Sequence, residues 1–333
     1  MRSEICYACA PLEGITGYRF RNAHRRWFGG VDRYYAPFFS PDQTHRLPPR
    51  DRRELCPEHN PAGDTVPQLL TRSAEDFLWA ARVLEDMGYG EVNLNLGCPS
   101  GTVTAKGKGA GFLARPAELE RFLDEIFPGT RLRISIKTRL GYAEPEEFAA
   151  LLALYNRYPV AELIVHTRVR SDFYRLPARP ELLPDILAHS AAPVCYNGDL
   201  FTQADCLRLT RSNPDLRALM LGRGLLCDPA LARKLRGGAG ADKDTLRAFL
   251  DELYQGYCQD FGSAPNAVRR MQELWTYLLC LFEESGRHRK QLRKAKHAAE
   301  YQAAVAAIFR ELELQAQGTG SNETLGGQAW KSN

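Results

Sequence analysis

Long apolar runs are missing from this sequence of 333 residues. No stretch approaches the roughly 18–20 apolar residues that a membrane-spanning helix needs, so we expect no membrane anchor. The segment from Met1 to Pro11 also lacks a long apolar core behind a basic start, which argues against a secretory signal. Together these absences favour a cytoplasmic protein.

A regular cysteine framework is missing as well. The nine cysteines are odd in number and scattered along the chain, which argues against a set of structural disulfides. Cys6 and Cys9 have the spacing of a metal or redox pair, but no second pair follows at zinc spacing. Because both lie in an apolar segment, we interpret them as residues of a first strand, and we expect no metal site.

A large excess of one charge is absent too. The 44 Lys and Arg residues oppose 40 Asp and Glu residues, which leaves a formal net charge of +4. This balance permits a polyanionic partner without requiring one. Hydrophobic residues make up 44% and charged residues 25% of the chain, as is usual for globular proteins. The length predicts one large domain and a small one.

Short apolar or β-rich runs recur along the first two thirds of the chain, with helix signals between many of them. Ser73 followed by Asp76 predicts a capped helix start, and Pro116 suits a first helical position. Strands that alternate with helices indicate a parallel sheet. Eight such units in about 235 residues fit a closed (β/α)8 TIM barrel better than the alternative, an open doubly wound α/β sheet. The expected strands are Ile5–Ala10, Val31–Ala36, Val66–Leu70, Glu91–Leu96, Arg133–Lys137, Glu162–His166, Pro193–Asn197 and Ala218–Leu221.

The pattern changes after the glycine-rich residues 237–240. An apolar stripe at helical spacing begins at Leu246, and residues 265–284 and 287–314 predict two further long helices without any strand. We therefore expect a barrel domain at residues 1–238 and a small all-helical domain at residues 242–314. The polar composition of residues 315–333 predicts a disordered tail.

Polar residues end several strands that are otherwise apolar. In a closed barrel the carboxyl ends of all strands meet on one rim, where such enzymes build their active sites. Because leaving these side chains buried and unpaired would be costly, their gathering predicts a ligand site. The strand-end residues are Gln68, Asn95, Lys137, His166 and Asn197, and Gly222-Arg223-Gly224 follows the last strand.

Two glycine motifs follow the seventh and eighth strands, at residues 197–199 and 222–224. Glycine lets backbone N–H groups approach a ligand closely, and the loops after these two strands commonly form the phosphate site of this barrel. Arg223 can add a charge-assisted contact. Lys137 and His166 suit an electron-rich ring such as a flavin, whose amide-like edge can pair with Gln68 and Asn95.

Cys98 stands apart from the other cysteines because it lies just past the fourth strand, on the predicted rim. A free thiol titrates near pH 8.5, so this one is mostly protonated at neutral pH and can act as a proton donor. The alternative is a buried, inert thiol. The glycine- and lysine-rich residues 102–111 that follow predict a mobile loop that could close over a substrate.

The ordered motifs of this chain resemble those of the tRNA-dihydrouridine synthase family over roughly residues 5–312. The most specific match is the run Asn95-Leu96-Gly97-Cys98-Pro99, which is similar to the family's motif around its catalytic cysteine. Residues 10–16, 67–70, 137–141, 166–168, 197–199 and 222–224 match in order and spacing. The chain departs from the usual family pattern at Leu12, Gly17 and Thr167.

The resemblance implies flavin mononucleotide (FMN) as cofactor, NADPH as reductant, and reduction of the C5–C6 bond of uridines in tRNA to 5,6-dihydrouridine. It also implies that hydride passes to C6 of the uracil and that Cys98 protonates C5, once the base has left its stack. The residues expected to bind the cofactor are Pro11, Leu12, Glu13, Gln68, Lys137, His166, Asn197, Gly198, Asp199, Gly222 and Arg223. Those expected to contact the substrate near the ring are Asn95, Arg139 and Arg168.

Basic residues gather between Gly286 and His297, where no acidic residue occurs. On a helix they would form a basic face suited to the backbone of a folded RNA, and the resemblance implies that this domain binds tRNA. The expected contacts are Arg287, Arg289, Lys290, Arg293 and Lys294. A second cluster is Arg19, Arg21, Arg25 and Arg26, for which we also favour RNA binding. A third, Arg46, Arg50, Arg52 and Arg53, is equally well explained as a solvated face.

Two other functions are compatible with parts of this pattern. An FMN-dependent barrel that acts on a small molecule, as dihydroorotate dehydrogenases do, would need neither the helical domain nor its basic face. A non-catalytic RNA-binding module would not need Cys98, Lys137, His166 and Arg223 together. The sequence does not indicate which uridine is reduced, and we take a monomer as the default.

Overall fold

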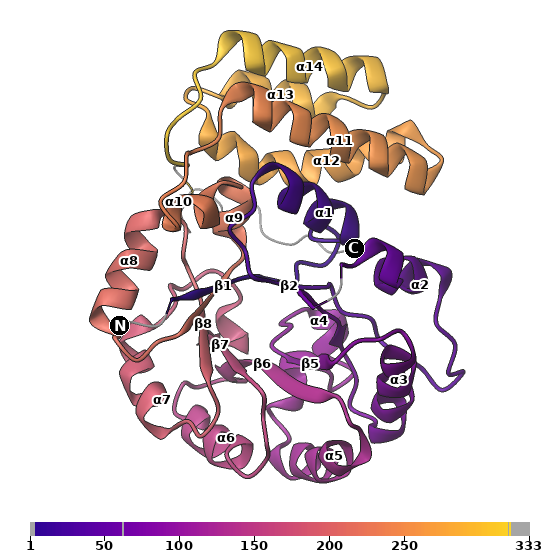
Figure 1. Ribbon diagram of the computed structural model, residues 1–333, viewed down its shortest axis with the longest axis vertical. Helices are drawn as coiled ribbons and strands as arrows, with labels where there is room; N and C mark the ends of the chain where they lie inside the picture. Colours follow the sequence, from indigo (N-terminus) through magenta and orange to yellow (C-terminus); the bar gives the residue numbers. More distant parts are fainter. Residues whose placement is uncertain (1–3, 62, 319, 321–333) are drawn as a thin grey trace.

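Parallel strands form a nearly closed barrel in the computed structural model, which describes residues 4–61, 63–318 and 320 (Figure 1). The strand order is β3-β2-β1-β9-β8-β7-β6-β5-β4, and every neighbouring pair is parallel. The end strands β3 (Thr65–Val66) and β4 (Gln68–Leu69) are separated only by Pro67, which has no N–H to donate to a ladder. They therefore act as one barrel strand, and the predicted (β/α)8 fold is confirmed.

The other strands lie close to their expected positions, but two are longer. The pairing of β6 with β7 continues through Thr138↔Val165 and Arg139↔His166 to Gly141↔Val169, so the expectation that Lys137 and His166 end their strands is wrong. The ladder can continue because the polar side chains beyond these points are buried and hydrogen-bonded. The strands are β1 (Cys6–Cys9), β2 (Arg33–Tyr35), β5 (Glu91–Leu96), β6 (Arg133–Gly141), β7 (Leu163–Val169), β8 (Val194–Asn197) and β9 (Ala218–Leu221).

Helices surround the strands, and their starts follow the predicted signals (Figure 1). Ser73 Oγ accepts a hydrogen bond from the Asp76 backbone N–H at 3.2 Å, and Pro116 is the first residue of its helix. The helices of the barrel are α1 (Tyr18–Trp27), α2 (Pro49–Leu55), α3 (Ala74–Asp86), α4 (Gly101–Thr104), α5 (Pro116–Gly129), α6 (Glu147–Tyr155), α7 (Leu183–His189), α8 (Gln203–Ser212), α9 (Arg223–Cys227) and α10 (Leu231–Leu235).

Four further helices pack together on one side of the barrel, next to α1 (Figure 1). They are α11 (Lys243–Phe261), α12 (Ala264–Leu278), α13 (Gly286–Lys294) and α14 (Ala298–Glu311). The single helix expected over residues 287–314 is wrong, because extended backbone at Ala295 and His297 separates α13 from α14. The Gln272 side-chain amide donates to the carbonyls of Leu292 and Ala295, which satisfies groups left open at the end of α13.

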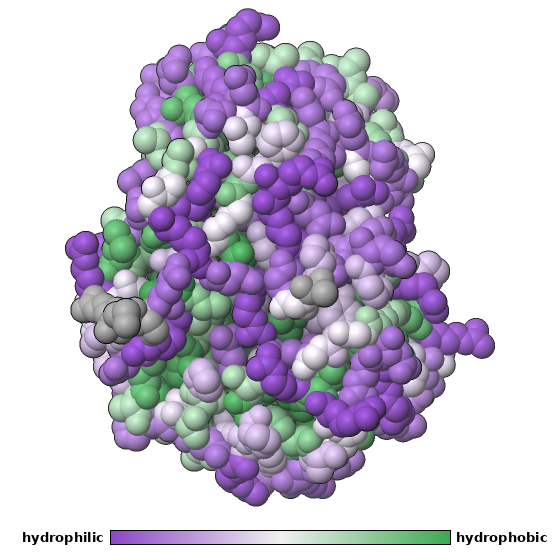
Figure 2. Space-filling model, in the orientation of Figure 1, coloured by the Kyte–Doolittle hydropathy of each residue, from purple (hydrophilic) through white to green (hydrophobic). Residues whose placement is uncertain are grey.

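The C-terminal helices share an apolar core with the barrel. Phe249 of α11 packs edge to face against Phe20 of α1 and against Phe28, the residue that follows α1. The ring centroids are 5.8 and 5.2 Å apart. Hydrophilic residues cover most of the face seen in Figure 2. The limits proposed for the two domains stay a prediction, because the shared core gives no sharp boundary.

The segment after α14 returns to the barrel. The Gln315 N–H donates to the Leu281 carbonyl, and Lys234 Nζ donates to the Ala316 carbonyl at 2.9 Å. The disordered tail expected over residues 315–333 therefore does not begin at Gln315, and residues 319 and 321–333 lie outside the described part of the chain. None of the described helices is both long enough and apolar enough to cross a membrane.

Candidate active site

A cavity of about 460 Å³ lies at the carboxyl end of the strands. Five residues that the sequence singled out line it together, from four segments of the barrel: Gln68, Asn95, Cys98, Lys137 and His166. Pro11, Leu12 and Glu13 after β1 line it as well. Residues far apart in the sequence thus meet at one site, as expected for the rim of this barrel.

A smaller cavity, of about 70 Å³, adjoins the first. Lys137 and His166 line both cavities, so the two are continuous along the rim. The expected phosphate-binding residues Asn197, Gly198, Asp199, Gly222 and Arg223 all line the smaller cavity. Cys98 and Arg223 therefore lie at the two ends of one elongated site.

A chain of amide hydrogen bonds holds the turn that carries Cys98. Asn95 Nδ2 donates to Gln68 Oε1 at 2.8 Å, and Gln68 Nε2 donates to Asn93 Oδ1 at 2.7 Å. Asn95 Oδ1 in turn accepts the N–H groups of Gly97 and Cys98, at 3.0 and 2.9 Å. Burial raises the pKa of the Cys98 thiol, so it keeps its proton at neutral pH.

Lys137 connects the two cavities. Its Nζ donates to Asn197 Oδ1 at 2.9 Å, and Asn197 Nδ2 donates to the Met220 carbonyl at 2.9 Å. Burial and the neighbouring Arg139 guanidinium lower the pKa of Lys137 to about 8. The side chain therefore carries its charge at neutral pH and loses it under mildly alkaline conditions.

Arg139 is fully buried beside Cys98, and its guanidinium is only partly satisfied by the protein. Nε donates to the Gly97 carbonyl at 3.0 Å, and Nη1 donates to the carbonyls of Val169 and Phe173. Nη2 is buried and has no hydrogen-bond partner among the described residues. Since Arg139 lines the larger cavity, this open N–H group can serve an oxygen of a bound ligand.

Asp199 joins two arginines at the smaller cavity. Its carboxylate accepts Nη2 of Arg168 at 2.6 Å, Nη2 of Arg223 at 2.8 Å and the Ala178 N–H at 2.8 Å. Gly198 has φ of +153°, and a Cβ there would lie 2.9 Å from the Cβ of Ala178. The backbone at this point thus tolerates no side chain, as expected for a segment that approaches a ligand closely.

Arg168 does not line either cavity, although the sequence places it among the substrate contacts. It is fully buried, and besides Asp199 it contacts His166, with Nη1 2.9 Å from Nε2 of the imidazole. Burial and the surrounding cations lower the pKa of His166, so the ring is neutral and accepts at Nε2. Its proton then sits on Nδ1, and Arg168 acts by holding His166 and Asp199.

Four residues of the larger cavity were not identified from the sequence: Phe38, Phe173, Tyr174 and Arg175. Three of them lie in the loop after β7, where no periodicity marks a functional position. The Tyr174 ring lies under the guanidinium groups of Arg223, Arg139 and Arg168, at 4.5, 5.5 and 5.7 Å. The arginines around His166 are the signal that could have found it, because cations favour an aromatic face.

The predicted mobile loop after Cys98 is partly folded against the site. Residues 101–104 form α4, and residues 109–112 form a buried 3-10 turn. The Ala110 N–H donates to the Cys98 carbonyl at 3.0 Å, and Arg170 Nη2 donates to Thr104 Oγ1. Closure of this segment over a substrate stays a prediction.

The first two basic clusters differ in the structure. On α13, Arg287, Lys290, Arg293 and Lys294 are exposed and Arg289 is half-buried, and none of the five lines either cavity. The second cluster is not a free basic face, and RNA binding there stays a prediction. Its members form ion pairs within the protein: Arg19 with Asp260, Arg21 with Glu54, Arg25 with Asp64 and Arg26 with Glu252.

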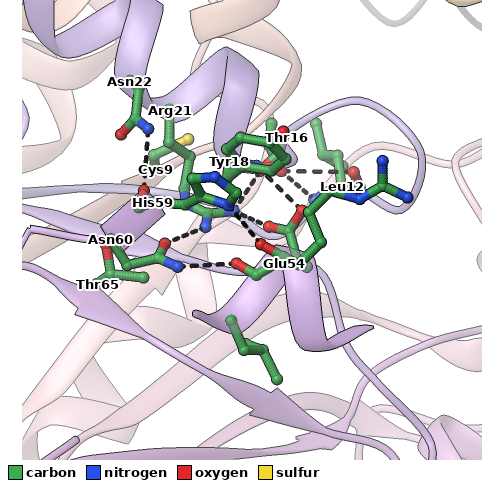
Figure 3. A network of polar contacts seen from close by, with 12 residues as sticks. Cys9, Leu12, Thr16, Tyr18, Arg21, Asn22, Glu54, His59, Asn60 and Thr65 are labelled. Atoms are coloured by element: carbon green, nitrogen blue, oxygen red, sulfur yellow. Dashed lines mark hydrogen bonds and ion pairs between the residues drawn. The ribbon is translucent and has the colours of Figure 1, made fainter. Parts of the chain in front are cut away.

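Arg21 is the centre of a buried network behind the β1–α1 loop (Figure 3). Its guanidinium donates to Glu54 Oε1 at 2.5 Å, to the Thr16 carbonyl at 2.9 Å and to Asn60 Oδ1 at 2.6 Å. Glu54 Oε2 also accepts the Tyr18 N–H, at 3.1 Å. Because Gly17 offers no side chain to cap α1, Glu54 supplies that cap from α2.

Replacing Arg21 with methionine is expected to destabilise the protein by about 3 kcal/mol or more, because Glu54 would keep a half-buried charge without its partner. Chemical denaturation followed by circular dichroism measures the effect. Arg52→Met is the matched control, because Arg52 is an exposed arginine of α2, two residues before Glu54. Equal unfolding midpoints for the two variants would show that the network does not hold the loop.

Known proteins resemble this chain over most of its length. The model of the dihydrouridine synthase family, Dus, matches residues 8–324. A tRNA-dihydrouridine(16) synthase of Cupriavidus necator is 30% identical over 285 residues, which cover 80% of this chain and 88% of that protein. The probable tRNA-dihydrouridine synthase 2 of Bacillus subtilis is 27% identical over 267 residues, 76% of this chain and 79% of its own. Among solved structures, a morphinone reductase shares the fold, with a TM-score of 0.51 and 14% identity over 72% of this chain and 87% of its own.

Proposed function

This chain belongs to the dihydrouridine synthase family, and from that premise we propose that it binds FMN and uses NADPH to reduce uridines of tRNA to 5,6-dihydrouridine. The observation that carries the proposal is the elongated site, in which Cys98 and Arg139 line one end and Arg223 lines the other. A tRNA substrate favours the cytoplasm as the place of action.

The residues of the two cavities fit FMN. At the smaller cavity, Gly198, Gly222 and Arg223 would hold the phosphate through close backbone approach and charge. At the larger one, Lys137 and the Nδ1–H group of His166 would donate to the polar edge of the ring. When bound, FMN supplies the hydride that is added to the uracil.

The protein's own groups would supply the proton and stabilise the developing charge. Cys98 holds a proton on Sγ, since burial raises the pKa of its thiol, and it would protonate C5 of the uracil. Negative charge develops on a carbonyl oxygen of the ring as hydride arrives. The open Nη2–H of Arg139 would donate to that oxygen.

The relatives also favour a target position. The Cupriavidus necator protein is named for position 16 of tRNA, and it covers 80% of this chain. We therefore propose uridine 16 as the substrate. A base in a tRNA loop can leave its stack at lower cost than a base in a duplex.

The direct test uses purified protein, NADPH and unmodified tRNA made by transcription. The proposal expects a flavin absorbance band near 450 nm, approximately as for any FMN protein, and dihydrouridine at position 16 by mass spectrometry. A protein without flavin, or one that turns over NADPH and leaves every uridine intact, would contradict it.

The exposed basic residues of α13 are expected to bind the tRNA backbone. Reversing two of them with Lys290→Glu and Arg293→Glu should raise the KM for tRNA about 10-fold or more and reduce the slope of log affinity against log salt by about 2, with unchanged flavin content. The control is Arg121→Glu with Arg131→Glu, an equal charge change on exposed residues at α5 and the loop after it. The same KM and salt slope for both double variants would exclude α13 from the tRNA interface.

A further inference from the structure

A second hollow, of about 120 Å³, lies beside the active-site cavity. Phe38 lines both spaces. Glu13 of the cavity and Arg50 of the hollow form an ion pair at 2.6 Å between them. The hollow is therefore a direct neighbour of the place where a substrate base would sit, and the reaction proposed above does not use it.

Aromatic rings form much of its wall: Tyr18, Phe38, Tyr257 and Phe261. The rings of Tyr257 and Phe261 are stacked, with centroids 6.0 Å apart. Phe261 is 41% exposed, and in the described part of the chain only Leu176, at 50%, is another large hydrophobic residue with such exposure. An aromatic surface held open to solvent beside a substrate cavity is suited to a planar, partly apolar ligand.

Four arginines and three carboxylates are the charged groups of the hollow. Arg19, Arg50, Arg53 and Arg270 line it together with the carboxylates of Asp51, Glu54 and Asp260. Asp260 is shared by Arg19, at 2.8 Å, and Arg53, at 3.9 Å. The side chains of Arg50 and Arg53 are 70% and 43% exposed, so both can also reach a group in solvent. These two exposed guanidinium groups are suited to an anionic group of a ligand.

The floor of the hollow is fixed before any ligand arrives. Tyr18 stacks on His59, with ring centroids 4.1 Å apart and planes at 10°, and its hydroxyl donates to Asp260 at 2.7 Å. Figure 3 shows Tyr18 next to the Arg21–Glu54 network, which holds the adjacent backbone. A fixed surface of this kind loses little conformational entropy when it binds a ligand.

We propose that this hollow binds an unpaired nucleotide directly next to the target uridine, with its base against Phe261 and its phosphate near Arg50 and Arg53. The inference rests on the proposed function and deepens it. An enzyme that extrudes a base also takes hold of the flanking nucleotides, and contacts to them set the sequence context that it accepts. The aromatic wall suits a base, and the exposed arginines suit a phosphate. Because Phe38 lines both spaces, the hollow is close enough to the cavity for its nucleotide to be joined covalently to the target uridine.

Phe261→Ala is the first arm of the test. It should raise the KM for tRNA about five-fold or more, as loss of one stacked base predicts, and leave kcat and flavin content unchanged. Phe261→Tyr keeps the ring and should restore the KM. Leu176→Ala is the matched control, because it removes the other exposed hydrophobic side chain, outside the hollow.

The second arm uses tRNA that carries an abasic site on either side of the target uridine. With the wild-type enzyme, one of these two substrates should show the same rise in KM. That rise should vanish in Phe261→Ala, because the base and the ring would belong to one interaction.

The outcomes separate this inference from the proposed function. If the wild-type enzyme reduces no uridine in intact tRNA, the proposed function fails. If the enzyme does reduce uridine, the test compares rises in KM. If the rise caused by Phe261→Ala simply adds to the rise caused by an abasic site, on either side of the target, the hollow does not hold a neighbouring base. A Phe261→Ala enzyme with a wild-type KM overturns the inference as well.

Discussion

Replacing Cys98 with alanine is expected to lower dihydrouridine formation about 100-fold or more, while the protein keeps its flavin. The side chain lines the larger cavity at the end away from the phosphate site, and Asn95 fixes its turn through two backbone hydrogen bonds. Alanine leaves these bonds in place, so only the proton donor is lost. Single-turnover reduction of unmodified tRNA, with flavin content measured on the same sample, checks the result.

The pH dependence tests the same assignment. Because burial raises the pKa of Cys98, the protonated and active thiol should persist at neutral pH, and at saturating FMN activity should fall only above the ordinary thiol pKa of about 8.5. Cys258→Ala is the matched control, since Cys258 is a half-buried cysteine of the helical region. Full activity in Cys98→Ala, or an equal loss of activity in Cys258→Ala, would show that Cys98 is not the proton donor.

Replacing Lys137 with methionine is expected to weaken FMN binding about 10- to 100-fold, the range for loss of a hydrogen bond from a charged donor. In the free protein Lys137 has a pKa of about 8, because burial and Arg139 oppose its charge. Because FMN would favour the charged form of Lys137, FMN binding should be strongest below pH 8 and should weaken as the pH rises through that value. Titration of the flavin-free protein with FMN, followed by flavin fluorescence from pH 6.5 to 9.5, measures both effects.

The methionine variant should lose this pH dependence along with the affinity. Lys106→Met provides the control, because Lys106 is an exposed lysine of the segment after Cys98. Since Lys137 also donates to Asn197, thermal unfolding of the variant should be measured alongside. An affinity that is unchanged, or that falls equally in Lys106→Met, would show that Lys137 does not contact the cofactor.

The barrel could be predicted because its signals are local. The capping at Ser73, the proline at residue 116 and the short apolar runs each depend on neighbours in the sequence. The lengths of β6 and β7 could not, since Arg139 can continue a buried strand only when three carbonyls, from the turn after β5 and from the end of β7 and its loop, receive its guanidinium. These carbonyls are brought to Arg139 only by the folding of the chain, so the sequence around Arg139 does not reveal them.

The same limit explains what was found and missed in the site. Polar residues at the predicted ends of apolar strands are visible in the sequence, and four of them meet at one cavity. Tyr174 was missed because an irregular loop delivers it. The ion pairs of the basic residues of α1 could not be predicted, because the partners of Arg19 and Arg21 lie in distant segments, Asp260 on α11 and Glu54 on α2.

The arrangement of Cys98, Arg139 and Arg223 around one elongated site is the basis of the proposed reaction. Mapping dihydrouridine in the tRNA of cells that lack this protein tests that reaction most directly. The account predicts that dihydrouridine disappears at position 16, returns when the wild-type chain is supplied and stays absent with Cys98→Ala. An unchanged pattern of dihydrouridine in cells without the protein would contradict it.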